Sequence, residues 1–271
     1  MPPDPRSHPF RDSVQDIETA RQIPDTPQTR SPSYRLAFAD PDFLTRDELR
    51  PVRLQLELLK PQMAMDEAGI ESTVVLFGGA RIPAPEHAAG LAGLAALAPY
   101  YEEARRFAFA MTERSLTTGG RRMVIATGGG PGVMEAGNRG AAEAGDGRSG
   151  LNIVLPHEQA PNPHVTPELS FNFHYFAIRK MHFLMRAAAV CVFPGGFGTM
   201  DEMFESLTLI QTGRMRKVPF LLFGREWWDS VVNWPKLAEA GVISPRDLEL
   251  FRFVETAEEA LSWIDYWPDG I

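Results

Sequence analysis

Short apolar runs alternate with helix-length segments from residue 73 onward, and this alternation is the feature that most constrains the fold. Most of the runs end at glycine or proline, as the strands of a buried parallel sheet do. The predicted strands are 73–77, 123–126, 151–155, 188–193 and 218–223, and the predicted helices are 100–115, 132–145, 174–187, 199–213, 227–239 and 256–266.

This alternation predicts an α/β fold: a Rossmann-like, doubly wound, mostly parallel sheet with helices on both faces. The N-terminal part differs, because residues 1–33 hold seven prolines and few large apolar groups. Such a composition cannot bury enough surface to offset its ordering entropy. We therefore expect an extended, proline-rich arm over residues 1–46 and a single domain over residues 47–271. Within it, residues 47–68 are predicted to be helical, with a break or a fresh start at Pro61.

Charge and composition exclude several classes of protein. The formal net charge of −8 argues against binding along a nucleic-acid backbone. The single cysteine, Cys191, excludes a disulfide framework and a cysteine-based metal site. No apolar run approaches the roughly 18 residues needed to cross a bilayer, and the first residues carry charges and prolines where a signal peptide would be apolar. We expect a cytoplasmic protein with no membrane or nucleic-acid partner.

Three of the predicted strand ends carry glycine-rich turns, at residues 77–81, 127–135 and 193–202. Ligands of such sheets bind at the carboxyl ends of the strands. Glycine lets the backbone approach a ligand closely, and the helix that follows each turn presents unpaired N–H groups that favour an anion. One such turn alone would be an ordinary tight connection, but three together predict an anion-binding cleft. Thr199 adds a hydroxyl and a predicted helix N-cap at the third turn.

Two familiar phosphate signatures are absent from these turns. The dinucleotide fingerprint G-x-G-x-x-G fails because Val133 and Asp201 stand where its last glycine should be. The Walker pattern fails because the chain has no Gly-Lys pair. The turns therefore suit a mononucleotide or a sugar phosphate, and an oxidoreductase is disfavoured.

Two helices next to these turns carry candidate charged groups. On 174–187, helical spacing predicts an apolar stripe opposite Arg179, His182 and Arg186. For His182 and Arg186 the preferred interpretation is a solvated basic face. On 199–213, helical spacing predicts that Glu202 projects away from the core. The predicted core-facing positions are Ala177, Met181, Leu184, Met185 and Ala188 on the first helix, and Met200, Met203, Phe204, Leu207 and Ile210 on the second.

Residues 194–202 fit the pattern PGGxGTxxE, residues 128–141 read GGGPGVMEAGNRGA, and Arg179 is followed by Lys180. Together these motifs resemble the LONELY GUY family of cytokinin riboside 5′-monophosphate phosphoribohydrolases, long mislabelled as lysine decarboxylases. The resemblance covers residues 70–225, and the flanking segments look like those of the longer bacterial members.

The resemblance implies a nucleotide-binding catalytic domain that hydrolyses the N-glycosidic bond of an adenosine 5′-monophosphate, often N6-prenylated, without a metal or other cofactor. Arg179 and Glu202 would be the catalytic pair, since the bond breaks through an oxocarbenium-like state that a carboxylate can stabilise. Homodimers or larger homo-oligomers with sites near the subunit interface are also implied. The residues implied to hold the nucleotide are Gly128, Gly129, Gly130, Gly132, Glu158, Lys180, Gly195, Gly196, Phe197, Gly198, Thr199 and Thr208.

Two other functions were weighed against this one. A non-catalytic nucleotide or molybdenum-cofactor carrier on the same scaffold would need neither Glu202 nor Arg179. A pyridoxal decarboxylase needs a Schiff-base lysine, and among the four lysines only Lys180 lies in a motif, so that label is rejected. The preferred base, AMP or N6-prenylated AMP, and the proton donor to the leaving base stay open.

Overall fold

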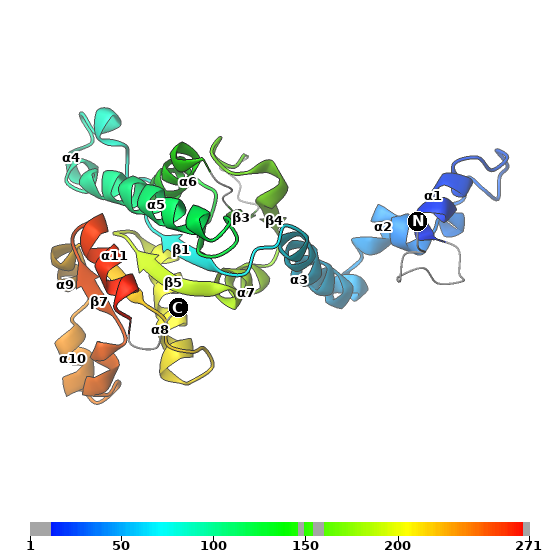
Figure 1. The fold of residues 1–271 in the computed structure, drawn as a ribbon. Helices are drawn as coiled ribbons and strands as arrows, with labels where there is room; N and C mark the ends of the chain where they lie inside the picture. Colours follow the sequence, from blue (N-terminus) through cyan, green and yellow to red (C-terminus); the bar gives the residue numbers. More distant parts are fainter. Residues whose placement is uncertain (1–11, 146–148, 154–159, 268–271) are drawn as a thin grey trace. The chain divides into compact units, whose positions relative to one another are not determined.

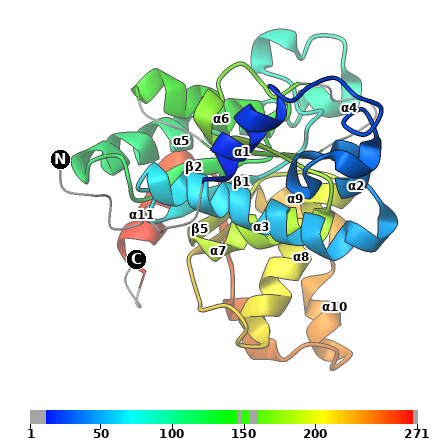
Figure 2. The same cartoon turned by 90° about the vertical axis from the view of Figure 1, so that its right-hand side faces the viewer.

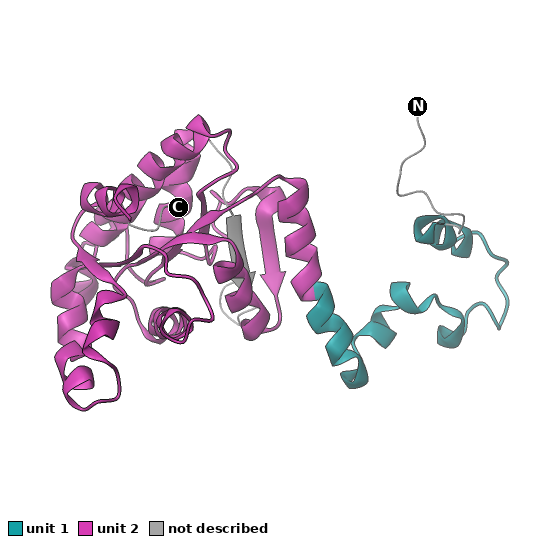
Figure 3. Ribbon diagram, turned by 60° about the horizontal axis from the view of Figure 1, so that its bottom comes forward, with its two compact units in different colours: residues 1–56 teal, residues 57–271 magenta. Residues whose placement is uncertain are grey.

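The computed structural model describes residues 12–145, 149–153 and 160–267. The chain divides into two compact units, residues 1–56 and residues 57–271 (Figure 3). The division falls inside helix α3 (Arg50–Glu67), later than the boundary at residue 46 expected from composition. That helix runs through Pro61 without the predicted break, because burial of the proline ring offsets the lost backbone hydrogen bond.

The first unit contains short helices where the sequence predicts an extended arm. Asp12 caps the first of them by accepting a hydrogen bond from the N–H of Val14, and Asp40 caps another through the N–H of Asp42. Within these described helices no residue is buried, in keeping with the proline-rich composition. The elements are α1 (Ser13–Ala20), η1 (Pro32–Tyr34), η2 (Ala37–Ala39), α2 (Pro41–Leu44) and η3 (Asp47–Leu49).

The second unit is built on a seven-stranded sheet in the order β4-β3-β2-β1-β5-β6-β7 (Figure 1). Every described strand pair is parallel, which confirms the predicted fold class. The strand order reverses between β1 and β5, and that switch point is where open α/β sheets bind ligands. The strands are β1 (Thr73–Phe77), β2 (Val124–Thr127), β3 (Ser149–Ile153), β4 (Ser170–Phe173), β5 (Ala187–Val192), β6 (Phe220–Phe223) and β7 (Arg252–Val254).

The two edge strands, β4 and β7, were not anticipated from the sequence. In β4 buried and exposed residues alternate, and β7 has only three residues with one fully buried. Neither segment carries the continuous apolar run that strands buried on both faces show, and short strands are common at sheet edges.

Helices cover both faces of the sheet. For this reason the run in β1 is continuously apolar. Val74 and Leu76 belong to the core packed under α5 and α6, whereas Val75 and Phe77 belong to the core packed under α7 and α8 (Figures 1 and 2). The predicted helix 227–239 is two helices, because the chain leaves helical geometry at Val232 before a second helix starts with Pro235 in its first turn. The helices of this unit after α3 are η4 (Pro85–His87), α4 (Ala92–Ala95), α5 (Pro99–Thr117), α6 (Val133–Ala144), η5 (Pro167–Leu169), α7 (Phe176–Met185), α8 (Phe197–Gln211), α9 (Arg225–Val231), α10 (Trp234–Glu239), η6 (Pro245–Glu249) and α11 (Ala257–Asp265).

The packing of α6 on α5 generates a stability prediction at Gly140. A Cβ at this position would overlap the backbone carbonyl oxygen of Arg105 in α5. Alanine usually stabilises a helix interior by up to about 1 kcal/mol relative to glycine, but overpacking against backbone costs about 1–3 kcal/mol. We expect Gly140→Ala to lower the free energy of unfolding by about 2 kcal/mol, measured by urea denaturation.

The matched control is Gly93→Ala on α4, where an added Cβ meets no described atom within 4 Å. We expect that variant to unfold at the same urea concentration as the original protein or at a slightly higher one. Equal midpoints for the two variants would show that α5 and α6 can separate at Gly140 without cost.

Candidate active site

The three glycine-rich turns converge at the carboxyl edge of β2, β1 and β5. The N–H of Gly79 after β1 donates to the carbonyl of Pro194 after β5, at 2.9 Å. The N–H of Val133 donates to the carbonyl of Gly79 at 3.3 Å, which ties in the turn after β2. Gly132 has φ +68° and lies against the same carbonyl, so a side chain there would be both strained and obstructed. The three turns thus form one backbone-lined surface.

An amide network fixes the turn after β2. Asn162 donates through Nδ2 to the carbonyls of Gly129 and Gly130 and to Oδ1 of Asn138, each at 3.0 Å. Thr127 donates its hydroxyl to the same Oδ1 at 2.7 Å and accepts from the N–H of Gly129 at 3.0 Å. Sequence reasoning missed Asn138 and Asn162, because their importance depends on a contact between distant segments.

Helix α8 begins at the turn after β5 with Gly196 as its N-cap, not with the predicted cap Thr199. Thr199 lies in the first helical turn, buried, with its side chain packed over Gly195. Within the described residues no side chain caps this helix start. N–H groups at an uncapped helix start favour an anion in general.

Helix α7 holds Arg179 against the turn after β2. The start of α7 is fixed by Glu57, whose carboxylate accepts from the N–H groups of His174 at 2.7 Å and Tyr175 at 3.0 Å. The guanidinium of Arg179 lies over the ring of Phe183, with Cζ 5.1 Å from the centroid. Its Nη2 reaches to 2.6 Å from the place where a Cβ on Gly128 would stand, so that turn and this arginine are in contact.

The predicted apolar stripe of α7 is wrong. Met181 and Met185 are about half exposed, whereas His182 and Phe183 are buried. Nε2 of His182 lies 3.3 Å from the carbonyl of Glu57, and burial lowers the pKa of this histidine. The predicted solvated face is therefore a contact with α3, which helical spacing alone cannot reveal. Arg186 belongs to the same contact, since its guanidinium pairs with Asp66 at 2.6 Å.

Glu202 is buried, contrary to the prediction that it projects away from the core. It is only 8% exposed, while Phe204, predicted to face the core, is 38% exposed; Met203 and Ile210 are buried as predicted. Burial raises the pKa of Glu202 to about 7, and the nearby positive charges of Arg179 and Lys180 oppose that rise. At neutral pH this carboxyl group can therefore both hold and release a proton.

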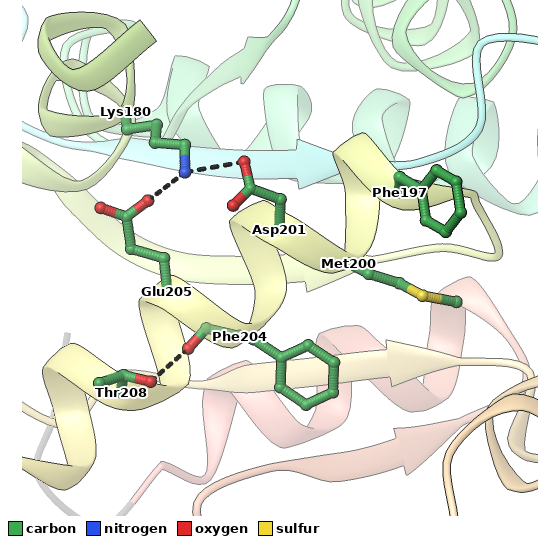
Figure 4. Close-up of a pocket in the computed structure, with 7 residues that line it drawn as sticks. All are labelled: Lys180, Phe197, Met200, Asp201, Phe204, Glu205 and Thr208. Carbon is green, nitrogen blue, oxygen red and sulfur yellow. Dashed lines mark hydrogen bonds and ion pairs between the residues drawn. The ribbon is translucent and has the colours of Figure 1, made fainter.

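Lys180 connects α7 to α8 through two ion pairs (Figure 4). Its Nζ lies 2.7 Å from Oδ2 of Asp201 and 2.7 Å from Oε2 of Glu205. Burial lowers the pKa of Lys180, but the hydrogen bonds to these two carboxylates outweigh it, so the net shift is upward. The three side chains form one wall of an open pocket of about 500 Å³, whose other lining residues are Phe197, Met200, Phe204 and Thr208.

The structure brings most of the sequence-predicted site residues to this one edge of the sheet. The exceptions are Thr208, which lies farther along α8 in the pocket wall, and Glu158, which lies outside the described residues. Over the described ranges no group of three or more His, Cys, Asp or Glu side chains could hold a metal ion. In the same part of the chain no helix is long and apolar enough to cross a membrane.

Fold and site together define an α/β protein in which three glycine-rich turns form one backbone-lined surface, with Arg179 and Glu202 on the helices beside it. A family model described as "Possible lysine decarboxylase" matches residues 134–264. Two cytokinin riboside 5′-monophosphate phosphoribohydrolases of Arabidopsis thaliana, LOG3 and LOG7, are 31% identical over 88 residues and 30% identical over 93 residues. These matches confirm the resemblance to the LONELY GUY family that the glycine motifs carry.

The matches to the curated relatives are partial. They cover 32% and 34% of this chain and 41% and 43% of LOG3 and LOG7, so the chain spans less than half the length of either relative. Among solved structures, a molybdenum cofactor binding protein of Rippkaea orientalis is 16% identical with a TM-score of 0.46, and a molybdenum cofactor carrier protein of Chlamydomonas reinhardtii is 16% identical with a TM-score of 0.42. Each alignment covers 72% of this chain and 96% of the other.

The raised pKa of Glu202 predicts a pH-dependent stability difference. The folded state holds the proton more tightly than the unfolded state, so stability falls as the pH rises from the ordinary glutamate range through about 7. Glu202→Gln stays neutral throughout. We expect its melting temperature to exceed that of the original protein by several degrees at about pH 8.5 and to match it at about pH 4.

The control for this comparison is Glu113→Gln, which changes an exposed glutamate on α5. We expect its melting curve to follow the original protein at both pH values. A Glu202→Gln variant that is less stable at the higher pH would contradict a destabilising buried carboxylate.

Proposed function

We propose that this chain hydrolyses the N-glycosidic bond of an adenosine 5′-monophosphate, with or without an N6 substituent, to release the free base and ribose 5-phosphate. The observation that carries the proposal is the placement of Arg179 and Glu202 at one edge of the sheet. Arg179 touches the turn at Gly128, and Glu202 lies in the first turns of the helix that follows Gly196. The named activity of LOG3 and LOG7 supports this proposal.

The 5′-phosphate would bind at the start of α8, where the helix has Gly196 as its N-cap and no described side-chain cap. N–H groups at such a helix start and the positive end of its dipole favour a phosphate. The turn at Gly128–Gly132 would line the same cleft, because it contacts the turn after β1 that is bonded to Pro194. Nucleotide contacts from Lys180 and Thr208 stay predictions.

The chemistry follows from the two charged groups. As the bond between C1′ of the ribose and the base breaks, its electrons leave with the base and positive charge develops on the sugar. Ionised Glu202 stabilises that charge and takes a proton from the attacking water, whose oxygen bonds to C1′, while the departing base takes up a proton from solvent. Because Arg179 stays protonated, it anchors the substrate and does not transfer a proton. The ionised fraction of Glu202 rises as the pH rises through about 7.

We also propose, from the family resemblance, that the protein is a cytoplasmic homo-oligomer with the cleft near a subunit interface. A carrier of a nucleotide or of a molybdenum cofactor is the competing function. It would bind its ligand without consuming it, so product analysis separates the two.

Removal of either charged group tests the proposal directly. We expect Glu202→Ala and Arg179→Ala each to reduce base release by at least about 10²-fold, since each removes a group that stabilises the developing charge. The measurement is chromatography of the free base after incubation with AMP and with isopentenyladenosine monophosphate. Glu113→Ala on α5 is the surface control.

The outcomes of this assay separate the candidate functions. Unchanged turnover in Glu202→Ala would remove the mechanism. Tight binding of both nucleotides without cleavage by the original protein would favour the carrier.

Gly128→Ala tests the contact between Arg179 and the turn after β2. The added Cβ would lie 2.6 Å from Nη2 of Arg179 and 2.6 Å from Sδ of Met134, both flexible side-chain ends. The fold can therefore absorb the change, but the guanidinium must move. We expect kcat to fall by about 10-fold to 10²-fold, the scale for a misplacement of about 1 Å.

Gly93→Ala, with open space around the added methyl group, is the control, and we expect it to keep full activity. Both variants should melt close to the original protein. Full activity in Gly128→Ala would show that this arginine acts from another position.

A further inference from the structure

Two neighbouring pairs of residues meet between α7 and α8. Arg179 is followed by Lys180 on α7, and Asp201 is followed by Glu202 on α8. The proposed reaction uses Arg179 and Glu202, while Lys180 and Asp201 form an ion pair that also takes in Glu205 (Figure 4). The residues that join the two helices are thus the immediate neighbours of those that would act on the substrate.

The ion pairs differ from ordinary surface pairs in their burial and geometry. The Lys180 side chain is only 16% exposed, and the Glu205 Oε2 atom that it contacts is buried. Exposed pairs contribute little to stability, but a largely buried ammonium held at 2.7 Å by two carboxylates is fixed in place. Its charge is also already balanced without a nucleotide.

The spacing of the two carboxylates fixes more than a distance. Asp201 and Glu205 are four residues apart, so they lie on one face of α8, one above the other. A lysine that pairs with both carboxylates is held at one position along the axis of α8 and at one angle around that axis. Because successive helix residues differ by about 100°, fixing Lys180 and Asp201 also fixes the directions of Arg179 and Glu202.

We infer that Lys180, Asp201 and Glu205 form an ion-pair clamp between α7 and α8 that positions Arg179 and Glu202 for the reaction. The three are positioning residues, and their effect on catalysis rests on the function proposed above. In the clamp Asp201 and Glu205 hold the ammonium group of Lys180. Lys180 then positions the two helices and does not contact the nucleotide directly.

The clamp also acts on Glu202 through its charge. Burial raises the pKa of Glu202, Arg179 and Lys180 lower it, and Asp201 and Glu205 raise it again. Removal of the lysine charge should therefore raise the pKa of Glu202 further. Removal of both carboxylate charges should lower it. The clamp therefore predicts that removal of the lysine charge and removal of the carboxylate charges shift the pKa of Glu202 in opposite directions.

The activity test compares both sides of the clamp. The variants are Lys180→Met, the double variant Asp201→Asn/Glu205→Gln, the triple variant that combines them, and Lys180→Arg. We expect the first two each to lower kcat for base release by about 10-fold to 10²-fold. The triple variant should be no worse than either, because all remove the same contact, and Lys180→Arg should restore part of the activity.

Lys236→Met is the matched control, since Lys236 and Glu239 form an exposed ion pair on α10 and neither residue lines the pocket. We expect it to keep full activity. A direct nucleotide contact by Lys180 gives a different result: Lys180→Met would raise KM, and the Asp201→Asn/Glu205→Gln variant would keep its kcat. That pattern overturns the clamp.

A second measurement does not depend on turnover. Carboxyl ¹³C NMR titration of the full chain, with the Glu202 signal assigned from Glu202→Gln, reports the pKa of that group. We expect an upward shift in Lys180→Met, a downward shift in Asp201→Asn/Glu205→Gln and none in Lys236→Met. Shifts in the same direction, or no shift, overturn the clamp.

The two measurements keep the two proposals apart. If the original protein cleaves neither nucleotide, the proposed function fails and the titration alone decides whether the clamp exists. If Lys180→Met does not fold, Lys180→Arg and the double variant still give the pKa of Glu202 and the kcat. Loss of activity with an unshifted pKa of Glu202 in the double variant overturns the clamp.

Discussion

The contact among three backbone turns is the constraint on which this site depends. The N–H of Gly79 reaches the carbonyl of Pro194, and Gly132 lies directly against the carbonyl of Gly79. A side chain at Gly132 would obstruct this approach, because its Cβ would overlap the carbonyl oxygen of Gly79. These contacts bring the ends of β2, β1 and β5 together in one surface lined by main-chain atoms, and the side chains beside it supply charge.

The positive charges near Glu202 oppose the rise in pKa that burial causes in a carboxyl group. Glu202 would lose its charge on burial, and Arg179 and Lys180 keep its pKa from rising further than about 7. The same lysine is held by two more carboxylates. Burial, the two positive charges and the neighbouring carboxylates therefore all act on the pKa of Glu202, and both of its protonation states are accessible near neutral pH.

The sequence predicts the central strands well because they are buried on both faces and read as continuous apolar runs. It also marks the cleft, since glycine is needed wherever backbones approach closely. The edge strands β4 and β7 lack such a run and escape detection. The orientation of α7 and the burial of Glu202 on α8 escape it too; for α7 the reason is that an amphipathic pattern assumes one buried side, whereas this helix contacts both the sheet and α3. Partners such as Asn162 for the turn after β2 depend on contacts between remote segments, which periodicity cannot indicate.

The cap that Glu57 provides for α7 has a consequence for the extent of the chain needed to keep the site. Both carboxylate oxygens of Glu57 hold main-chain N–H groups just before the helix that carries Arg179. A version shortened from the N-terminus can omit residues up to 56 and retain this support. One that starts beyond Glu57 keeps the whole sheet yet leaves the arginine helix without its anchor, so the practical lower limit of the domain is set by a carboxylate and not by the first strand.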